Sequence, residues 1–164
     1  LYGKDFPRTA RDNKKMKIAI ASDHGGYALK NELLPYITEL GHEFRDFGCY
    51  STDSMDYPDI AFPAAEAVAS GEFDRGILIC GTGIGVMIAS NKVKGAYAAV
   101  VNNVYQAQRA QLSNNANIIT IGAQVTGIEV AKMMVKEYLS CTFDPNSRSA
   151  PKIERIYEYE KANS

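Results

Sequence analysis

The chain has 164 residues, 46% of them hydrophobic, which is enough to bury a sizeable core. Its 18 basic and 19 acidic side chains nearly cancel and are spread along the sequence, which argues against a nucleic-acid partner and against binding to an anionic membrane surface. No run approaches the ~20 apolar residues of a membrane span, and no charged-then-apolar leader is recognisable, so we expect a soluble protein that does not associate with membranes.

The N-terminal residues differ in character from the remainder of the chain. Residues 1–15 are polar, basic and aperiodic, whereas Met16 begins a regular β-type run. We therefore expect residues 1–15 to be an appended or disordered extension, and residues 16–164 to form one domain.

From Met16 onward, short apolar runs alternate with helical patterns, which is typical of repeated βα units and a parallel sheet. Strands are predicted at residues 17–22, 43–47, 76–80, 96–101 and 117–122. The first, third, fourth and fifth of these are almost continuously apolar, as in strands that are covered on both faces. Helices are predicted at residues 27–40, 58–70, 84–92, 104–112, 126–139 and 151–161. The pattern predicts a three-layer α/β/α fold of flavodoxin-like or Rossmann-like type, with a five-stranded parallel sheet and an additional C-terminal helix.

A glycine-rich turn follows the third predicted strand. Cys80 ends this strand, and glycines occupy three of the next five positions, 81–85. Such a turn lets backbone N–H groups converge, and the N-terminus of the following helix adds positive potential, so an anion can be held beside the sulfur. The same environment can make a thiol reactive and stabilise charge that develops on a substrate. The alternative is a buried cysteine that ends a core strand before an ordinary turn.

Asp23 and His24 follow the first predicted strand. If the first and third strands are neighbours, as in the flavodoxin-like order, these side chains face Cys80 across one crevice, near the hydroxyl of Thr82. Taken alone, Asp23 could be a helix cap and His24 a solvated loop residue. Their co-location with a thiol and an anion-binding turn favours a catalytic site.

Other chemistries fit the sequence less well. The glycine spacing is G-x-G-x-G and follows the third strand, so it does not match a dinucleotide fingerprint, and a P-loop lysine is lacking. We expect no metal and no cofactor, because only Asp23, His24 and Cys80 are available as ligands. The three cysteines lie far apart and lack paired metal-ligand spacing, which favours a reducing, cytoplasmic compartment and gives Cys80 no nearby resolving partner for a redox switch.

Several motifs together resemble one family. They are S-D-H-G-G at residues 22–26, D-Y-P at 56–58, G-I-L-I-C-G-T-G-I-G at 76–85, N-K-V-K-G at 91–95 and N-N-A-N-I-I at 114–119. In this order they resemble type B ribose-5-phosphate isomerase over residues 16–161. The resemblance implies a flavodoxin-like sheet, a homodimer or dimer of dimers with active sites built from both chains, and interconversion of an aldose phosphate and a ketose phosphate without metal or cofactor.

The resemblance also implies roles for individual residues. Cys80 matches the catalytic base, and Thr82 matches a hydroxyl that moves protons between two substrate oxygens. Such chemistry passes through an enediolate and requires a base beside fixed hydrogen-bond donors. The substrate-binding positions implied in the same way are Asp23, His24, Tyr57, Gly81, Gly83, Ile84, Gly85, Asn114, Arg148 and Lys152.

The chain departs from the family pattern at the positions that open the sugar ring and bind phosphate. Ser113 occupies the place of a ring-opening histidine, and Gln124 that of a phosphate-binding arginine. Lys152 would offer phosphate a point charge where arginine offers a fork. The favoured hypothesis is a ribose-5-phosphate isomerase that acts on the spontaneously opened sugar, or uses other groups to open it, and that binds phosphate less strongly. The alternatives are an isomerase of another sugar, such as a hexose phosphate, a tetrose phosphate or an unphosphorylated sugar, and a noncatalytic sugar-phosphate-binding module; galactose-6-phosphate isomerases share the fold.

The last predicted helix is amphipathic. Ile153, Ile156 and Tyr157 lie on one face of it at helical spacing. This face suits packing against a partner chain or against the helix's own domain.

Overall fold

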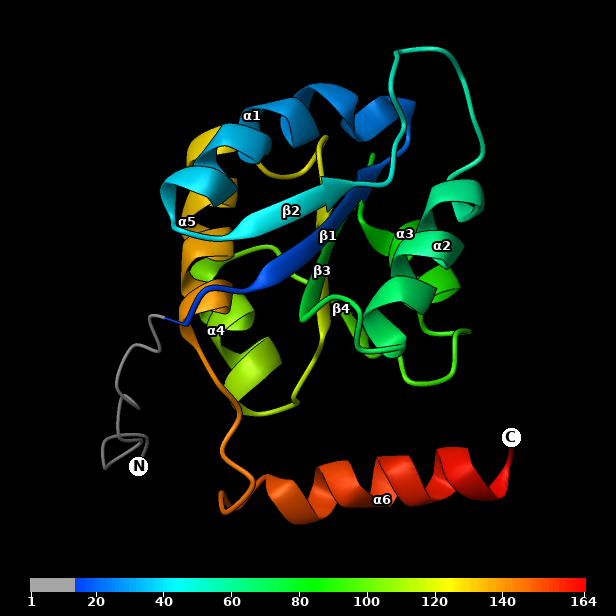
Figure 1. Ribbon diagram of the computed structural model, residues 1–164, viewed down its shortest axis with the longest axis vertical. Helices are drawn as coiled ribbons and strands as arrows, with labels where there is room; N and C mark the ends of the chain where they lie inside the picture. The colour runs from blue at the N-terminus through cyan, green and yellow to red at the C-terminus, as the bar shows by residue number, and fades with distance from the viewer. Residues whose placement is uncertain (1–13) are drawn as a thin grey trace.

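A computed structural model describes residues 14–164 as a five-stranded parallel sheet between two layers of helices (Figure 1). The strands are β1 (Lys17–Ser22), β2 (Glu43–Asp46), β3 (Arg75–Cys80), β4 (Ala98–Val100) and β5 (Ile118–Gly122). The helices are a 3₁₀ turn η1 (His24–Gly26), α1 (Tyr27–Glu39), α2 (Pro58–Ala69), α3 (Ile84–Ser90), α4 (Val104–Leu112), α5 (Ile128–Ser140) and α6 (Ala150–Ala162). The predicted fold class is confirmed, and the observed boundaries differ from the predicted ones by at most two residues. The predicted extension lies outside the described residues except for Lys14 and Lys15, which belong to no helix or strand.

The strand order is β2-β1-β3-β5-β4. β1 and β3 are neighbours as expected, with Ser22 opposite Ile79 in the register. The last two strands are exchanged relative to the flavodoxin order. The exchange follows from their burial, because β5 is buried throughout and lies inside the sheet, whereas the three residues of β4 are only half-buried at its edge. The prediction that the fourth strand is fully covered is therefore wrong.

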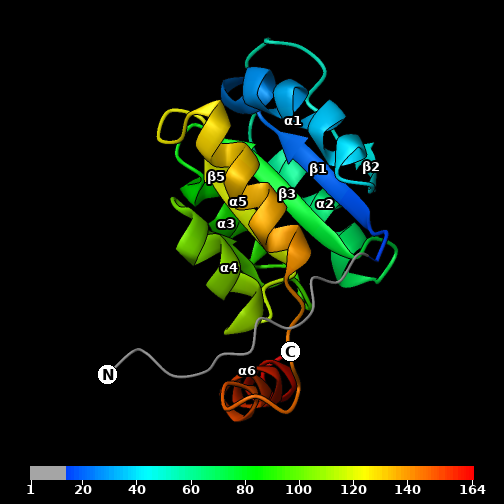
Figure 2. The same cartoon turned by 90° about the vertical axis from the view of Figure 1, so that its left-hand side faces the viewer.

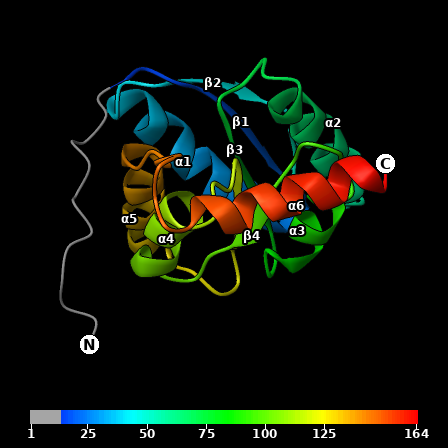
Figure 3. The same cartoon turned by 90° about the horizontal axis from the view of Figure 1, so that it is seen from below.

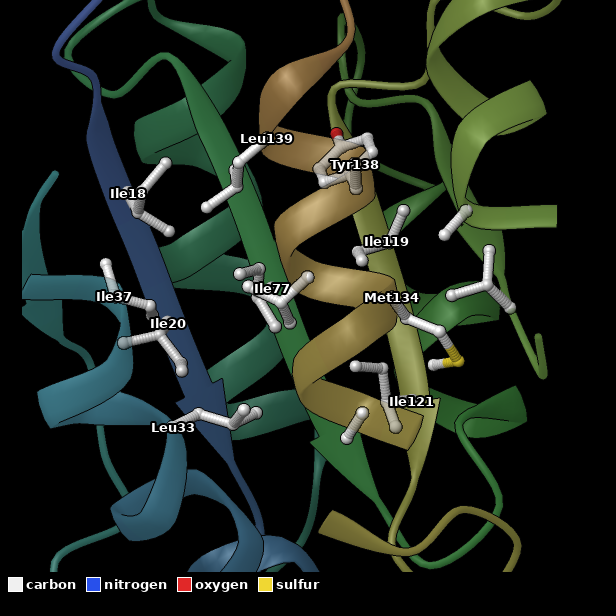
Figure 4. Packing of buried hydrophobic residues seen from close by; sticks show 14 of the residues in the cluster. Ile18, Ile20, Leu33, Ile37, Ile77, Ile119, Ile121, Met134, Tyr138 and Leu139 are labelled. Atoms are coloured by element: carbon white, nitrogen blue, oxygen red, sulfur yellow. The ribbon is translucent and has the colours of Figure 1, made fainter. Parts of the chain in front are cut away.

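Each face of the sheet has its own hydrophobic core. Ile18 and Ile20 of β1 pack toward α1, α4 and α5, while the alternate residues Ala19 and Ala21 pack toward α2 and α3. Figure 2 shows α1, α5 and α4 side by side over the first face. The isoleucines of β1, β3 and β5 interdigitate there with side chains of α1 and α5 (Figure 4). These two cores fix the positions of the strand ends, and so of the loops that follow them.

Helix α6 lies across the amino ends of the strands, as seen from below in Figure 3. Glu160 accepts hydrogen bonds from the backbone N–H of Gly95, at 2.7 Å, and from the hydroxyl of Tyr97 just before β4. Tyr157 accepts one from the side-chain amide of Asn115 at 3.0 Å. Ile153 is buried. The amphipathic face thus packs partly on its own chain.

His42 provides a test of how pH acts on this fold. The backbone N–H of Met16 donates to Nδ1 of His42 over 3.1 Å, which requires an unprotonated Nδ1. Burial, and then the positive charge of Arg75, hold the pKa of His42 below its usual 6.5, against the opposing effect of Asp74. The folded chain therefore binds fewer protons than the unfolded chain as the pH falls through 6.5, and the free energy of unfolding should decrease there.

Urea denaturation between about pH 7.5 and pH 5 measures this effect. We expect wild-type protein to lose stability over this range, and the His42→Gln variant to lose less. Equal pH dependence in the two proteins would contradict the role of His42.

Candidate active site

Cys80 ends β3 and is held by its own turn. Its side chain is 5% exposed, and Sγ accepts a hydrogen bond from the backbone N–H of Gly83 at 3.1 Å. The exposed Thr82 accepts one at Oγ1 from the N–H of Ile84 at 3.2 Å. The predicted turn is present, and two of its amides bind the sulfur and the hydroxyl that sequence analysis assigned to catalysis.

The turn is fixed against the end of β5. Gly83 has φ +78°, and its carbonyl oxygen accepts a hydrogen bond from the Thr120 hydroxyl at 2.7 Å. A Cβ added to Gly122 would lie 2.6 Å from the carbonyl carbon of Thr82. Only glycines at these two positions allow the turn to approach β5 this closely, so the location of the sulfur depends on them.

The loop after β1 lies beside the turn, as the adjacency of β1 and β3 requires. The N–H of Asp23 donates to the carbonyl of Ile79 at 3.2 Å, and a Cβ added to Gly25 would lie 3.7 Å from the nitrogen of Gly81. Asp23 is 9% exposed, and its Oδ1 accepts from the N–H of Gly26 at 3.1 Å. The carboxylate of Asp23 therefore caps η1, as in the alternative to a catalytic role that the sequence left open. It also lies next to the Cys80 turn.

His24 and Tyr57 link a third segment to the site. Nδ1 of the exposed His24 accepts a hydrogen bond from the N–H of Met55 at 3.1 Å, which places the proton of the neutral ring on Nε2. Tyr57 precedes α2 and is 38% exposed. A Cβ added to Gly85 would lie 2.6 Å from Cζ of Tyr57, so the ring packs directly on the start of α3.

Lys30 binds the beginning of the segment that runs from β2 to Tyr57. It is fully buried in α1, and its Nζ donates to Oδ1 of Asp46 at 2.8 Å and to the carbonyl oxygen of Cys49. A buried ammonium requires such partners. This ion pair fixes the path of the chain from β2 toward Tyr57.

Gln124 also contacts the turn. Its N–H donates to the carbonyl of Gly81 at 2.9 Å, and its carboxamide lies 3.5 Å from where a Cβ of Gly81 would be. Sequence analysis noted this residue as a neutral replacement but did not include it in the site. The structure places an uncharged amide, rather than a cation, at the rim of the Cys80 turn.

The remaining predicted residues, Asn114, Arg148 and Lys152, lie elsewhere. They line a cavity of about 400 Å³ between the end of α4 and the start of α6, which we call the α4–α6 pocket. Asn114 lies before β5, which begins at Ile118, and the register places Gly122, at the other end of that strand, opposite Cys80. At about 3.3 Å per residue, the strand alone separates the two groups by roughly 13 Å. One chain does not bring them together.

Arg109 is a pocket residue that sequence analysis missed. It is half-buried on α4, and its Nε donates to Oγ of Ser113 at 2.6 Å. The i, i+4 spacing of these two residues on the predicted helix was the available signal.

Neither a metal centre nor a membrane span is found in residues 14–164. In this part of the chain, no three His, Cys, Asp or Glu side chains are grouped so that they could hold an ion. None of its helices is both long and apolar enough to cross a bilayer.

Comparison with known proteins shows the family to which the chain belongs. The family model described as Ribose/Galactose Isomerase matches residues 18–156. The chain therefore belongs to the ribose/galactose isomerase family. A solved structure of Clostridium thermocellum ribose-5-phosphate isomerase B superimposes with a TM-score of 0.87 at 47% identity, over 91% of this chain and 100% of that one.

Members of the ribose/galactose isomerase family with similar identity to this chain carry different names. A putative sugar phosphate isomerase of Bacillus subtilis is 46% identical over 90% of this chain and 99% of its own length. A D-erythrulose-4-phosphate isomerase of Mycolicibacterium smegmatis is 45% identical over the same shares of the two chains. Overall identity thus establishes an isomerase family, while the choice of sugar depends on individual residues.

Proposed function

We propose that the protein interconverts an aldose phosphate and a ketose phosphate, with ribose 5-phosphate as its main substrate and Cys80 as the base. The observation that carries this proposal is the position of Cys80 Sγ, which accepts a hydrogen bond from the Gly83 amide at the carboxyl end of β3, in the same turn as the exposed Thr82. A module that only binds sugar phosphates would need the amides of the turn but not the thiol.

The reaction requires proton transfers only. The Cys80 thiolate takes the proton from C2 of the open-chain aldose, and the C–H electron pair forms the C1=C2 bond of an enediolate while the π pair of the C1=O1 bond moves onto O1. Thr82 moves the proton of O2 to O1, the C2=O2 bond forms, and the electron pair of the C1=C2 bond takes the proton of the Cys80 thiol at C1 to give the ketose. No electron leaves the substrate, so the sequence of steps needs no external oxidant. Donors of the 81–85 turn, with Asp23 and Tyr57, would hold the oxygens of the substrate.

We further propose that two chains form each complete site, in a homodimer or a dimer of dimers. Asn114, Arg148 and Lys152 lie at the opposite end of the sheet from Cys80, so they can act on the same substrate only if a second copy supplies them. Ile84 and Ile88 lie one turn apart on α3 and are 50% and 52% exposed, which suits a face that a partner covers.

The state of the cysteines supports a cytoplasmic location. Cys49, Cys80 and Cys141 are all free, and the proposed base must remain reduced to act. A reducing compartment meets this requirement.

Ser113 favours a second candidate substrate, a four-carbon sugar phosphate. Ribose 5-phosphate closes a ring through its O4, and opening that ring requires proton transfer, which a serine hydroxyl performs poorly near neutral pH. A tetrose 4-phosphate cannot close this ring, because its O4 carries the phosphate. The Mycolicibacterium smegmatis relative is named for such a substrate.

A substrate panel tests both candidates. Wild-type and Ser113→His proteins are offered ribose 5-phosphate, erythrose 4-phosphate, galactose 6-phosphate and free ribose. We expect Ser113→His to raise the ratio of kcat/KM for ribose 5-phosphate to that for erythrose 4-phosphate by about threefold or more, because only the first substrate has a ring to open. A wild-type kcat/KM that is highest for erythrose 4-phosphate would replace the pentose with the tetrose as main substrate. Binding without turnover of any sugar phosphate would overturn the catalytic proposal.

A further inference from the structure

The α4–α6 pocket concentrates positive charge. Arg109, Arg148 and Lys152 all line it, giving a formal charge of +3 in a protein whose net charge is −1. The residues of the described part of the chain that line it include no carboxylate. Hydroxyl and amide groups add further donors, and the buried Ile153 also lines the pocket. Such a lining suits a ligand with two negative charges better than a neutral sugar.

Arg109 is a cation of this pocket whose guanidinium is held by a neighbouring side chain. It is half-buried on α4, one helical turn before Ser113, and its Nε–H donates to the Ser113 hydroxyl oxygen at 2.6 Å. This bond sets the plane of the guanidinium. The two Nη groups complete the planar fork of donors with which arginine binds two oxygens of one phosphate. Lys152 and Arg148, in contrast, are exposed near the start of α6.

We propose that Arg109 is a phosphate-binding residue of this enzyme that determines its specificity for phosphorylated sugars, and that Ser113 positions it. Arg109 acts with Arg148 and Lys152 on the phosphate group while the reacting carbons lie at Cys80 of the partner chain. This inference rests on the proposed function and on its two-chain site. It also accounts for the neutral Gln124 at the rim of the Cys80 turn, because the charge that recognises phosphate is gathered in the α4–α6 pocket instead.

Kinetics of matched arginine variants test the proposal. Arg109→Gln should raise KM for ribose 5-phosphate between about tenfold and a hundredfold and leave kcat within about twofold, because a lost hydrogen bond to a charged group weakens binding without moving the base. Inhibition by inorganic phosphate should weaken by the same factor. Arg155→Gln removes an exposed arginine of α6 that does not line the pocket, and both constants should stay within about twofold of wild type.

Two further variants separate phosphate binding from a structural role. Arg109→Lys keeps the charge but not the fork, and should give a KM between those of wild type and Arg109→Gln. Ser113→Ala should raise KM less than Arg109→Gln does, in the same direction. An unchanged KM and unchanged phosphate inhibition in Arg109→Gln would overturn the proposal. So would a lower kcat and a lower melting temperature at constant KM, since that pattern indicates a structural role.

Direct binding distinguishes this inference from the proposed reaction. Inorganic phosphate is titrated calorimetrically into Cys80→Ser protein and into Cys80→Ser protein that also carries Arg109→Gln. Weaker binding to the double variant supports Arg109 as a phosphate ligand even if no sugar phosphate is isomerised. Equal binding to the two proteins refutes it even if the isomerase activity is present.

Discussion

Replacing Cys80 with alanine is expected to lower kcat for aldose–ketose conversion by about 10²–10⁴-fold, which is the usual contribution of a positioned base, and to change KM little. The same variant should stop exchange of the C2 hydrogen of the substrate with solvent deuterium, since that exchange reports removal of the carbon-bound proton. Coupled assays of ketose formation and proton NMR in heavy water measure the two effects. Near-normal turnover with retained exchange would show that another group is the base.

The chain offers a matched control for this substitution. Cys141 is also buried, at 7% exposure, but it directly follows α5, away from the Cys80 turn. Alanine at this position removes a similar sulfur from a packed interior, so Cys141→Ala should share any small loss of stability and keep kcat. An equal loss of kcat in the two variants would mean that cavity formation, and not loss of the base, explains the effect.

Mixing experiments extend the prediction to the two-chain site. Cys80→Ala and Arg148→Ala chains are each expected to be weakly active alone. In a random mixture, half of the dimers are hybrids, and each hybrid has one site with both residues intact, so about a quarter of the wild-type activity should return. If each site were built from a single chain, no activity would return.

The sheet was predictable from sequence to the extent that it depends on local pattern. Continuous apolar runs located β1, β3 and β5, and the glycines and Pro58 marked where helices begin and end. The lateral order of the last two strands could not be predicted in this way, because hydrophobic periodicity describes a strand and not its neighbours. It follows from the contrast between a short, half-buried β4 and a fully buried β5, which only the assembled sheet displays.

The candidate site likewise has a part that the sequence pattern predicts and a part that it does not. Asp23, His24 and Cys80 come together because they follow adjacent parallel strands, a relation that the sequence pattern already contains. The α4–α6 pocket depends on where α6 packs, and its connection with Cys80 would depend on a second chain. Arg109 on α4 therefore resembles an ordinary solvated helix cation until α6 is placed beside it.

Replacing Gly83 with alanine is expected to lower kcat at least about a hundredfold and to reduce the free energy of unfolding by about 2–4 kcal/mol. Gly83 has φ +78°, which costs any residue with a Cβ. That Cβ would also lie 2.9 Å from the carbonyl carbon of Ile121 and 3.0 Å from the nitrogen of Gly122, and neither backbone atom can move aside without disturbing β5. The turn must shift instead, and the N–H that holds the Cys80 sulfur shifts with it.

Alanine variants of two other glycines distinguish the effect of the positive φ of Gly83 from the effect of its contact with β5. Gly41 has φ +92° with no atom within 4 Å of an added Cβ, so Gly41→Ala should cost about 1 kcal/mol of stability and leave kcat unchanged. Gly127 has φ −73° and equally open surroundings, so Gly127→Ala should leave kcat unchanged and lower the free energy of unfolding by about 1 kcal/mol or less, because alanine is a poorer N-cap of α5 than glycine. Chemical denaturation and steady-state kinetics of the three variants measure the differences. The steric contact with β5 must displace the Gly83 amide in Gly83→Ala. If this variant nevertheless loses no more activity than Gly41→Ala, the catalytic sulfur does not depend on that amide.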